Sequence, residues 1–250
     1  MSAELNGRKV LVTGGASGIG AACAVAFAAA GAAVTVADLD EQGARKVAEP
    51  LGGTAVRVDL ADPAFDAAAL AGGMDVIVNN AGIQHVAPVE EFPPERFSLI
   101  VRLMLESPFR LIRAALPQMY ASGWGRVVNI SSAHGLVASP YKSAYVAAKH
   151  GLEGLSKVVA LEAGPKGVTS NCVSPGYVRT PLVERQVADQ ARMHGIAESE
   201  VVEQVMVSES AIKRLVEPGE VAEMVAYLCS PAGSFITGTS VSIDGGWTAR

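Results

Sequence analysis

Cysteine, aromatic side chains and surplus basic charge are all scarce in this sequence of 250 residues. Lys and Arg number 20 against 25 Asp and Glu, and the net charge of -5 argues against the basic surface that nucleic acids or anionic membranes require. The three cysteines, Cys23, Cys172 and Cys229, are far apart and each has apolar neighbours. This pattern favours buried reduced thiols over a disulfide framework or a metal site, and it indicates a reducing cytoplasm.

Internal repeats, low-complexity tracts and linkers are absent as well, so one domain is expected to span residues 1–250. The N-terminal residues carry no signal-peptide pattern. One almost uncharged run, residues 19–37, is long enough to raise the question of a membrane span. It is mostly alanine and is interrupted by Gly31, so a buried strand–helix–strand unit explains it better.

A glycine-rich turn joins a predicted strand to a predicted helix near the N-terminus. Its Gly14, Gly18 and Gly20 allow the backbone to approach a pyrophosphate closely, and free amides at the helix N-terminus attract the negative charge. The sequence therefore predicts a dinucleotide site. The elements around the turn are a strand at 9–13, a helix at 21–30 and a second strand at 33–37.

Asp38, at the end of the second strand, predicts a preference for NAD. Its carboxylate can accept hydrogen bonds from an adenosine ribose and repel a 2′-phosphate, and no arginine adjoins it to attract one. The alternative is that Asp38 caps a helix that begins after Leu39.

The alternation of helices and strands continues and predicts an α/β fold, a Rossmann-type doubly wound parallel sheet with helices on both faces. The next elements are helix-like segments at 41–51 and 63–71 and strands at 54–58 and 75–78. Asp59 follows one strand and is placed to meet an adenine amine, and residues 79–82 follow the other and can line the cofactor without bulk. Each of these segments could instead be turn chemistry.

Tyr145 and Lys149 are four residues apart, so on a helix they share one face, where the ammonium would favour a phenolate. Ser132 follows an apolar strand at 127–130, at the edge of the sheet where α/β proteins bind ligands. The pattern predicts Tyr145 as a general base and the Ser132 hydroxyl as a partner for the substrate oxygen. An isolated Tyr-x-x-x-Lys match is usually a surface pair, but this one accompanies the glycine turn.

Taken together, these motifs resemble the short-chain dehydrogenase/reductase family over essentially the whole chain. The matching segments are 13–20, 79–82, Ser132, 145–149 and 174–180. The resemblance implies that Lys149 clamps the ribose and stabilises the phenolate, and that Thr180 meets the nicotinamide carboxamide. The cofactor residues expected from the motifs and the resemblance are Gly14, Ser17, Gly18, Ile19, Gly20, Asp38, Asp59, Asn80, Ala81, Gly82, Tyr145, Lys149, Pro175, Gly176, Val178 and Thr180.

Within the family, segments 83–88, 133–142, 180–183 and 244–249 resemble bacterial D-3-hydroxybutyrate dehydrogenases. That resemblance implies a homotetramer that transfers a hydride between NAD and a short 3-hydroxy acid. The substrate residues it implies are Gln84, Ser132, His134, Lys142, Tyr145, Gln186 and Trp247. Simpler explanations exist: Lys142 as a solvated helix-start residue, His134 as a turn former, and Gln186 in a helix of unfixed register.

Met104 stands where the family usually has an asparagine that supports a helix kink, with a free carbonyl that holds a water; the resemblance implies that this water forms a proton path from the lysine to bulk solvent. Its thioether cannot replace that amide. Pro108, four residues later, lacks the amide hydrogen that would bond the Met104 carbonyl in a continuing helix. We therefore expect Met104 at the catalytic centre, with Pro108 supplying the kink.

Residues 181–215 form the most polar long stretch and are a predicted substrate lid, with a solvated excursion as the alternative. A final helix is expected at 218–229 and a final strand at 239–243. The departure at Met104 leaves a catalytically impaired NAD-binding homologue as a competing function, and another secondary alcohol or ketone as a competing substrate.

Overall fold

Parallel strands form a seven-stranded sheet in the order β3-β2-β1-β4-β5-β6-β7 in this computed structural model, which describes residues 5–184 and 186–249. From β1 the chain builds outward in one direction through β2 and β3, then returns to place β4 on the other side of β1. This is the predicted doubly wound α/β fold. The strands are Lys9–Thr13 (β1), Ala33–Asp38 (β2), Thr54–Arg57 (β3), Val76–Asn79 (β4), Gly125–Ile130 (β5), Val168–Pro175 (β6) and Ser240–Ile243 (β7).

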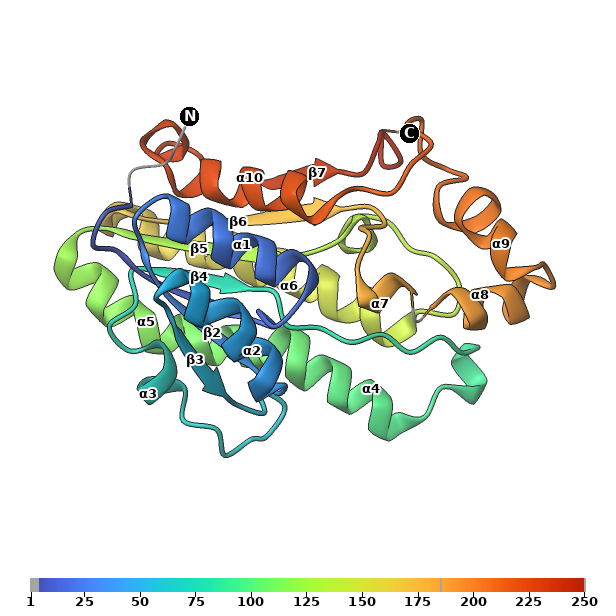
Figure 1. Ribbon diagram of the computed structural model, residues 1–250, viewed down its shortest axis with the longest axis horizontal. Coiled ribbons are helices and arrows are strands. Elements are labelled where there is room, and N and C mark those ends of the chain that lie inside the picture. Colours follow the sequence, from blue (N-terminus) through green and yellow to red (C-terminus); the bar gives the residue numbers. More distant parts are fainter. Residues whose placement is uncertain (1–4, 185, 250) are drawn as a thin grey trace.

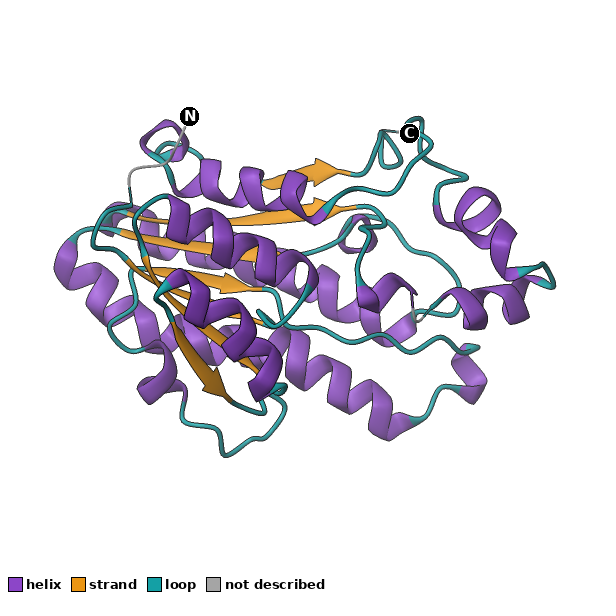
Figure 2. Cartoon of the chain, viewed as in Figure 1, coloured by secondary structure: helices purple, strands orange, loops and turns teal. Residues whose placement is uncertain are grey.

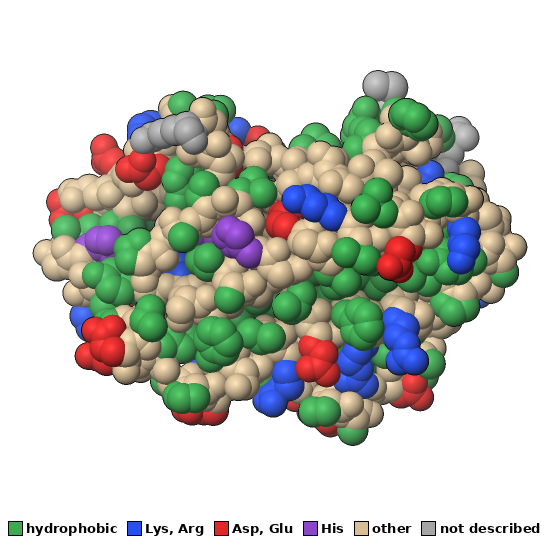
Figure 3. Space-filling model, turned by 180° about the vertical axis from the view of Figure 1, so that it is seen from behind, with side chains coloured by type: hydrophobic (Ala, Val, Ile, Leu, Met, Phe, Trp, Pro, Cys, Tyr) green, Lys and Arg blue, Asp and Glu red, His purple; other side chains and the backbone are tan. Residues whose placement is uncertain are grey.

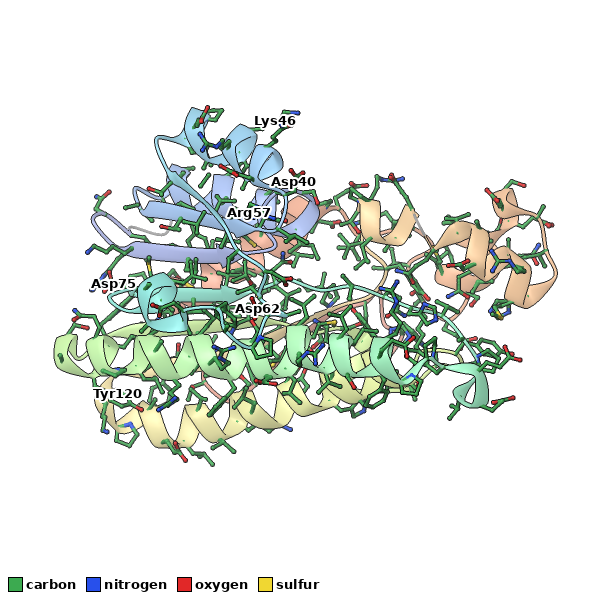
Figure 4. All side chains as sticks on the ribbon, turned by 90° about the horizontal axis from the view of Figure 1, so that it is seen from below. Asp40, Lys46, Arg57, Asp62, Asp75 and Tyr120 are labelled. Atoms are coloured by element: carbon green, nitrogen blue, oxygen red, sulfur yellow. The ribbon has the colours of Figure 1, made fainter. Side chains whose placement is uncertain are left out.

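Helices cover both faces of the sheet (Figures 1 and 2). Seen from below, α1 and α2 lie on one side of the strands, and α5 and α6 lie on the other (Figure 4). The helices are Gly18–Ala29 (α1), Glu41–Ala48 (α2), Ala67–Ala71 (α3), Pro94–Val101 (α4), Ser107–Ser122 (α5), Ser143–Ala163 (α6), Pro181–Glu184 (α7), Val187–His194 (α8), Glu198–Val201 (α9) and Pro218–Cys229 (α10).

The central strands β1 and β4 are largely apolar because the sheet is buried on both faces there. Val10 of β1 packs in a core with Phe27 of α1, whereas the next residue, Leu11, packs in a second core with Leu111 and Met119 of α5. The alanine-rich run at 19–37 thus belongs to the predicted strand–helix–strand unit. No helix in the described part of the chain is long and apolar enough to cross a membrane.

The predicted helix at 63–71 was wrong at its start. The Asp66 carboxylate accepts the amide of Ala69 at 2.9 Å and begins α3 at Ala67. Upstream, the Asp62 carboxylate accepts the amide of Ala64 at 2.8 Å, which turns the chain (Figure 4). Side chains that hydrogen-bond to nearby amides compete with a helix, so this stretch forms turns.

Two segments extend beyond the carboxyl ends of the strands, where parallel sheets bind ligands (Figure 1). The first comprises α7, α8, α9 and a π-helical turn, Val202–Met206, and it has a small apolar core that includes Val183, Ala191 and Val201. It corresponds to the predicted lid at 181–215, of which Arg185 lies outside the described residues. The second is α4, which continues through a π-helical turn, Arg102–Glu106, into α5.

Candidate active site

The glycine turn after β1 borders a cleft of about 280 Å³ at the switch point between β1 and β4. Gly14 has φ +62°, and a Cβ atom there would lie 2.7 Å from the Cα atom of Ala81. A Cβ atom on Gly20 would lie 2.3 Å from the Gly14 carbonyl oxygen. Only glycine fits these positions, and the turn delivers the chain to the N-terminus of α1 with its amides available to an anion.

Asn80 holds this turn in place. Its amide nitrogen donates to the carbonyl oxygens of Thr13 and Gly14, both at 2.9 Å. The Thr13 hydroxyl donates to the Val78 carbonyl and accepts the backbone amide of Asn80. Asn80 therefore positions the glycine turn as well as lining the cleft.

Asp38 borders the same cleft, and it does not cap α2. Its two carboxylate oxygens accept the amides of Ala16 and Asp40, each at 3.0 Å. The cap of α2 is Asp40, whose carboxylate accepts the amide of Gly43 (Figure 4). The helix-cap explanation of Asp38 is therefore wrong.

Most of the expected cofactor residues border this cleft or an adjoining cavity of about 90 Å³. The cleft is lined by Gly14, Ser17, Gly18, Ile19, Asp38, Asp59, Asn80, Ala81, Gly82 and Thr180. The cavity is lined by Ile19, Asn80, Gly82, Tyr145, Lys149, Pro175, Gly176, Val178 and Thr180. Gly20 lies behind the turn, and one Asp59 oxygen also accepts the amide of Ala61 in a turn.

The adjoining cavity brings Ser132, Tyr145, Lys149 and Met104 together. Ser132 follows β5 and caps a short 3-10 turn, Ala133–Gly135, by accepting the amide of His134. Tyr145 and Lys149 lie in the first turns of α6, with the Lys149 ammonium 5.6 Å from the centre of the Tyr145 ring.

The charges in this cavity differ from the sequence expectation. The Lys149 ammonium donates to the Ile130 carbonyl, and burial lowers its pKa to about 8. Burial raises the pKa of Tyr145, and a hydrogen bond with Ser132 opposes that rise. The expected lowering of the Tyr145 pKa was therefore wrong, because burial outweighs the hydrogen bond with Ser132.

A third cavity, of about 50 Å³, adjoins the reactive hydroxyls. It shares Ser132, Tyr145 and Gly176 with the adjoining cavity of about 90 Å³. The lid segment covers it with Leu182, Val183 and Gln186. The remaining lining residues are Gln84, His134, Lys142 and Tyr177.

Lys142 and His134 are both buried in the wall of this cavity, at 3% and 4% exposure. The solvated-lysine explanation of Lys142 is therefore wrong. Its ammonium donates to the Tyr177 hydroxyl at 2.6 Å, and burial lowers its pKa to about 8. Burial, followed by the charges of Lys142 and His150, lowers the pKa of His134 to about 3, so its imidazole is neutral.

Two buried polar atoms of the wall have no protein partner among the described residues, Oε1 of Gln84 and Nε2 of His134. Gln186 also borders the cavity, with its amide nitrogen bonded to the Leu182 carbonyl at 3.0 Å. Buried polar atoms are usually satisfied, so their position in the wall of a cavity is typical of a ligand site.

Tyr177 was not predicted from the sequence as a site residue. Trp247 was expected to contact the substrate, but it does not line the cavity. Tyr177 lines the cavity, and its ring stacks on Trp247 with an interplanar angle of 12°. Trp247 supports the wall from behind, 4.9 Å from the His134 ring centre. The sequence did contain a signal for Tyr177. It comes directly after Pro175 and Gly176, two expected cofactor residues at the end of a strand.

Comparison with known proteins places this geometry in a family. A family profile described as Enoyl-(Acyl carrier protein) reductase matches residues 14–248. D-beta-hydroxybutyrate dehydrogenase of Rhizobium meliloti (strain 1021) is 46% identical and covers 97% of this chain and 99% of its own. The enzyme of that name from Cupriavidus necator is 42% identical, covering 98% and 100%. The chain belongs to the short-chain dehydrogenase/reductase family.

Solved structures agree with this assignment. One described as a short chain dehydrogenase/reductase family protein superposes with TM-score 0.87 at 35% identity, covering 99% of this chain and all of that one. Another, assigned as an NAD(P) dependent gluconate 5-dehydrogenase from Beutenbergia cavernae and solved with NADP at low occupancy, gives 0.88 at 33% identity, with 99% of each chain covered. The chain is thus an oxidoreductase that uses a nicotinamide cofactor.

The family position occupied by Met104 lies in the π-helical turn, and the predicted continuation of the helix is confirmed. The amide of Ser107 bonds the Arg102 carbonyl five residues earlier, and Pro108 then has no amide to offer the Met104 carbonyl. The Met104 side chain is buried and packs near Gly82 and Tyr145.

Pro108→Ala is expected to slow turnover, because the new amide can capture the Met104 carbonyl and straighten this turn. The loss should be smaller than the ~10²-fold that removal of a general acid–base group costs, since the proton path is impaired but not deleted. Steady-state kinetics at several pH values measure it.

Met104→Asn is the matched comparison and should change turnover only modestly. A large gain in Met104→Asn without a loss in Pro108→Ala would show instead that the proton path of this chain is defective.

Proposed function

We propose that this dehydrogenase interconverts D-3-hydroxybutyrate and acetoacetate with NAD. The observation that carries the proposal is the buried ammonium of Lys142 in the same small cavity as Ser132 and Tyr145. A buried ammonium favours an anion, and about 50 Å³ of space favours one of few atoms. The names of the two bacterial relatives support the same substrate.

The cleft residues fit a nicotinamide dinucleotide. The glycine turn leaves no side chain between the backbone and a pyrophosphate, and the N-terminus of α1 attracts its charge. When bound, the nicotinamide supplies the hydride acceptor for oxidation and the hydride donor for reduction.

Asp38 supports NAD over NADP. Its carboxylate borders the cleft and would repel a 2′-phosphate. The neighbour solved with NADP shows that the fold itself can hold that cofactor, so we assign the distinction to this side chain.

In the proposed oxidation, the Tyr145 phenolate takes the proton of the substrate hydroxyl as C3 loses its hydride. The Ser132 hydroxyl holds the same oxygen, and the Lys149 ammonium stabilises the phenolate. In reduction, protonated Tyr145 returns the proton to the carbonyl oxygen. Oxidation needs Tyr145 without its proton and Lys149 with its own, so the rate should rise with pH as Tyr145 deprotonates and be limited on the alkaline side by loss of the Lys149 charge, whose pKa burial lowers to about 8.

The direct test is NADH formation with D- and L-3-hydroxybutyrate, with a bulky secondary alcohol as a control. The D-acid should be oxidised and the bulky alcohol should not. Oxidation of the bulky alcohol in preference to both acids would contradict the proposal and favour another secondary alcohol as substrate.

Replacing the ammonium tests the anion pocket. Lys142→Met keeps the apolar stem and removes the charge, so KM for the acid should rise by about 10- to 100-fold, the worth of a charged hydrogen bond, with a smaller change in kcat. The methyl ester of the same acid should be nearly unaffected.

The pH dependence of native activity gives a second readout. Since burial lowers the Lys142 pKa to about 8, its positive charge is present below that pH and lost above it. The ratio of kcat/KM for the acid to that for the ester should therefore fall above about pH 8. Lys157→Met, which removes an exposed charge from the same helix, is the control. Equal use of acid and ester at every pH would exclude an anion pocket.

We propose further that the lid segment closes over the substrate and that the protein is a cytoplasmic homotetramer. The lid residues in the cavity wall support the first. The second is supported by two exposed apolar side chains on α6, Val158 at 51% and Leu161 at 80%. Hydrophobic side chains are also widespread on the face of the molecule seen from behind (Figure 3). Three buried unpaired thiols fit a reducing compartment.

A further inference from the structure

Glu153 is a buried carboxylate one helical turn beyond Lys149 on α6, with 6% of its surface exposed. Its Oε1 atom accepts the hydroxyls of Ser174 of β6 at 2.9 Å and Ser240 of β7 at 3.0 Å. No basic side chain in the described part of the chain lies within ion-pair distance of it. A buried carboxylate with only neutral partners is costly, so its charge calls for an explanation.

The group that the Glu153 charge affects is the Lys149 ammonium, as the side chains around Lys149 show. Burial has the largest effect on the pKa of Lys149 and lowers it. The groups that raise this pKa are Cys172 of β6 and Glu153 of the same helix. Burial raises the pKa of the Cys172 thiol, so that group is neutral at working pH. The ammonium also contacts the neutral Ile130 carbonyl, to which it donates, and lies 5.6 Å from the centre of the Tyr145 ring. Glu153 therefore supplies the negative charge that faces Lys149 from within the fold.

We propose that Glu153 is a positioning residue that keeps Lys149 protonated. It acts from outside the cavities, since it lies one turn beyond Lys149 on α6 and serines of two strands hold its carboxylate. Charges separated by one turn of a buried helix interact strongly because little water screens them. The proposal rests on the proposed role of Lys149 beside Tyr145, and it assigns Glu153 no contact with substrate.

Glu153→Gln tests it, because the amide oxygen can still accept both serine hydroxyls while the charge is gone. The pH midpoint of the Lys149 ammonium is measured by NMR titration of the nitrogen-15-labelled lysines, with Lys149→Met to assign the signal, on the whole enzyme with and without NAD. The midpoint should fall by about one pH unit, and the alkaline limit of kcat/KM should fall with it.

Two controls separate charge from packing. Ser156→Ala removes the buried hydrogen bond to Ser170 at the same contact between α6 and β6, and it should lower stability without moving the midpoint. Glu162→Gln removes an exposed carboxylate of α6 and should change neither. Glu153→Asp keeps the charge and should restore most of the midpoint, and it replaces Glu153→Gln if that variant does not fold.

A Glu153→Gln enzyme that loses stability but titrates like the native one would overturn the proposal and leave Glu153 a purely structural link. The titration needs no substrate. Failure to oxidise 3-hydroxybutyrate would therefore refute the proposed function without touching this result, and an unmoved midpoint would refute the role of Glu153 without touching the substrate.

Discussion

Tyr145→Phe is expected to lower turnover by roughly 10²-fold or more while leaving the affinity for NAD within a few-fold of the native value. The substitution removes one oxygen atom, the one that would exchange a proton with substrate. The ring still fills its place beside His134, whose ring centre lies 6.0 Å away, and the cleft that holds most of the dinucleotide is untouched. Stopped-flow hydride transfer and fluorescence titration with NADH measure the two quantities.

The pH profile adds a signature that damage to the fold does not produce. In the native enzyme, oxidation should rise with pH as Tyr145 loses its proton, whereas the residual activity of Tyr145→Phe should lack that rise. Tyr141→Phe is the matched control, since Tyr141 lies two residues before the start of α6 and outside the cavities described above. Comparable turnover in Tyr145→Phe and native enzyme would exclude Tyr145 as the base.

Asp38→Ala should change the ratio of kcat/KM for NAD to that for NADP by about 10²-fold. Two effects add: the ribose hydroxyls lose a charged acceptor, and the 2′-phosphate no longer meets a carboxylate. Each is of the size of one charged hydrogen bond, about 1.5 kcal/mol or more. Initial rates with both cofactors at saturating substrate give the ratio.

Asp40→Ala distinguishes this effect from loosening of the loop. Asp40 carries the same charge two residues later and caps α2, but it does not border the cleft. It should lower the melting temperature without raising the use of NADP. If the native protein used NADP as efficiently as NAD, Asp38 would not be the discriminating group.

Local patterns predicted most of the fold because the first strands, β1, β2 and β4, are short apolar runs that end at a polar or glycine residue. The helix predicted at 218–229 is α10, with Pro218 at its start and Glu220 bonding back to the amide of Glu217. The pattern predicted a longer helix than α3, because aspartate side chains before it bond the amides that a helix would use.

The candidate site was only partly predictable, since spacing shows which residues share a face but not how deep they lie. The solvated explanation of Lys142 failed for this reason, because its burial depends on Tyr177 and on the lid, both far along the chain. The direction of the Tyr145 pKa failed likewise, since it depends on desolvation by segments that a short motif does not contain. The pairing of Asp38 with the glycine turn, in contrast, follows from adjacent strands.

The π-helical turn Arg102–Glu106 makes α4 and α5 one rod with two registers. Such a turn amounts to a single extra residue in a helix, and each α-helical residue is about 100° of rotation. If the same residues wound as a regular α-helix, one half would be rotated about its own axis relative to the other. Either Ile100 would turn away from the core beneath the site, or Leu111 would turn away from the sheet. The π-helical turn therefore absorbs one residue and lets both halves of the rod face their cores at once.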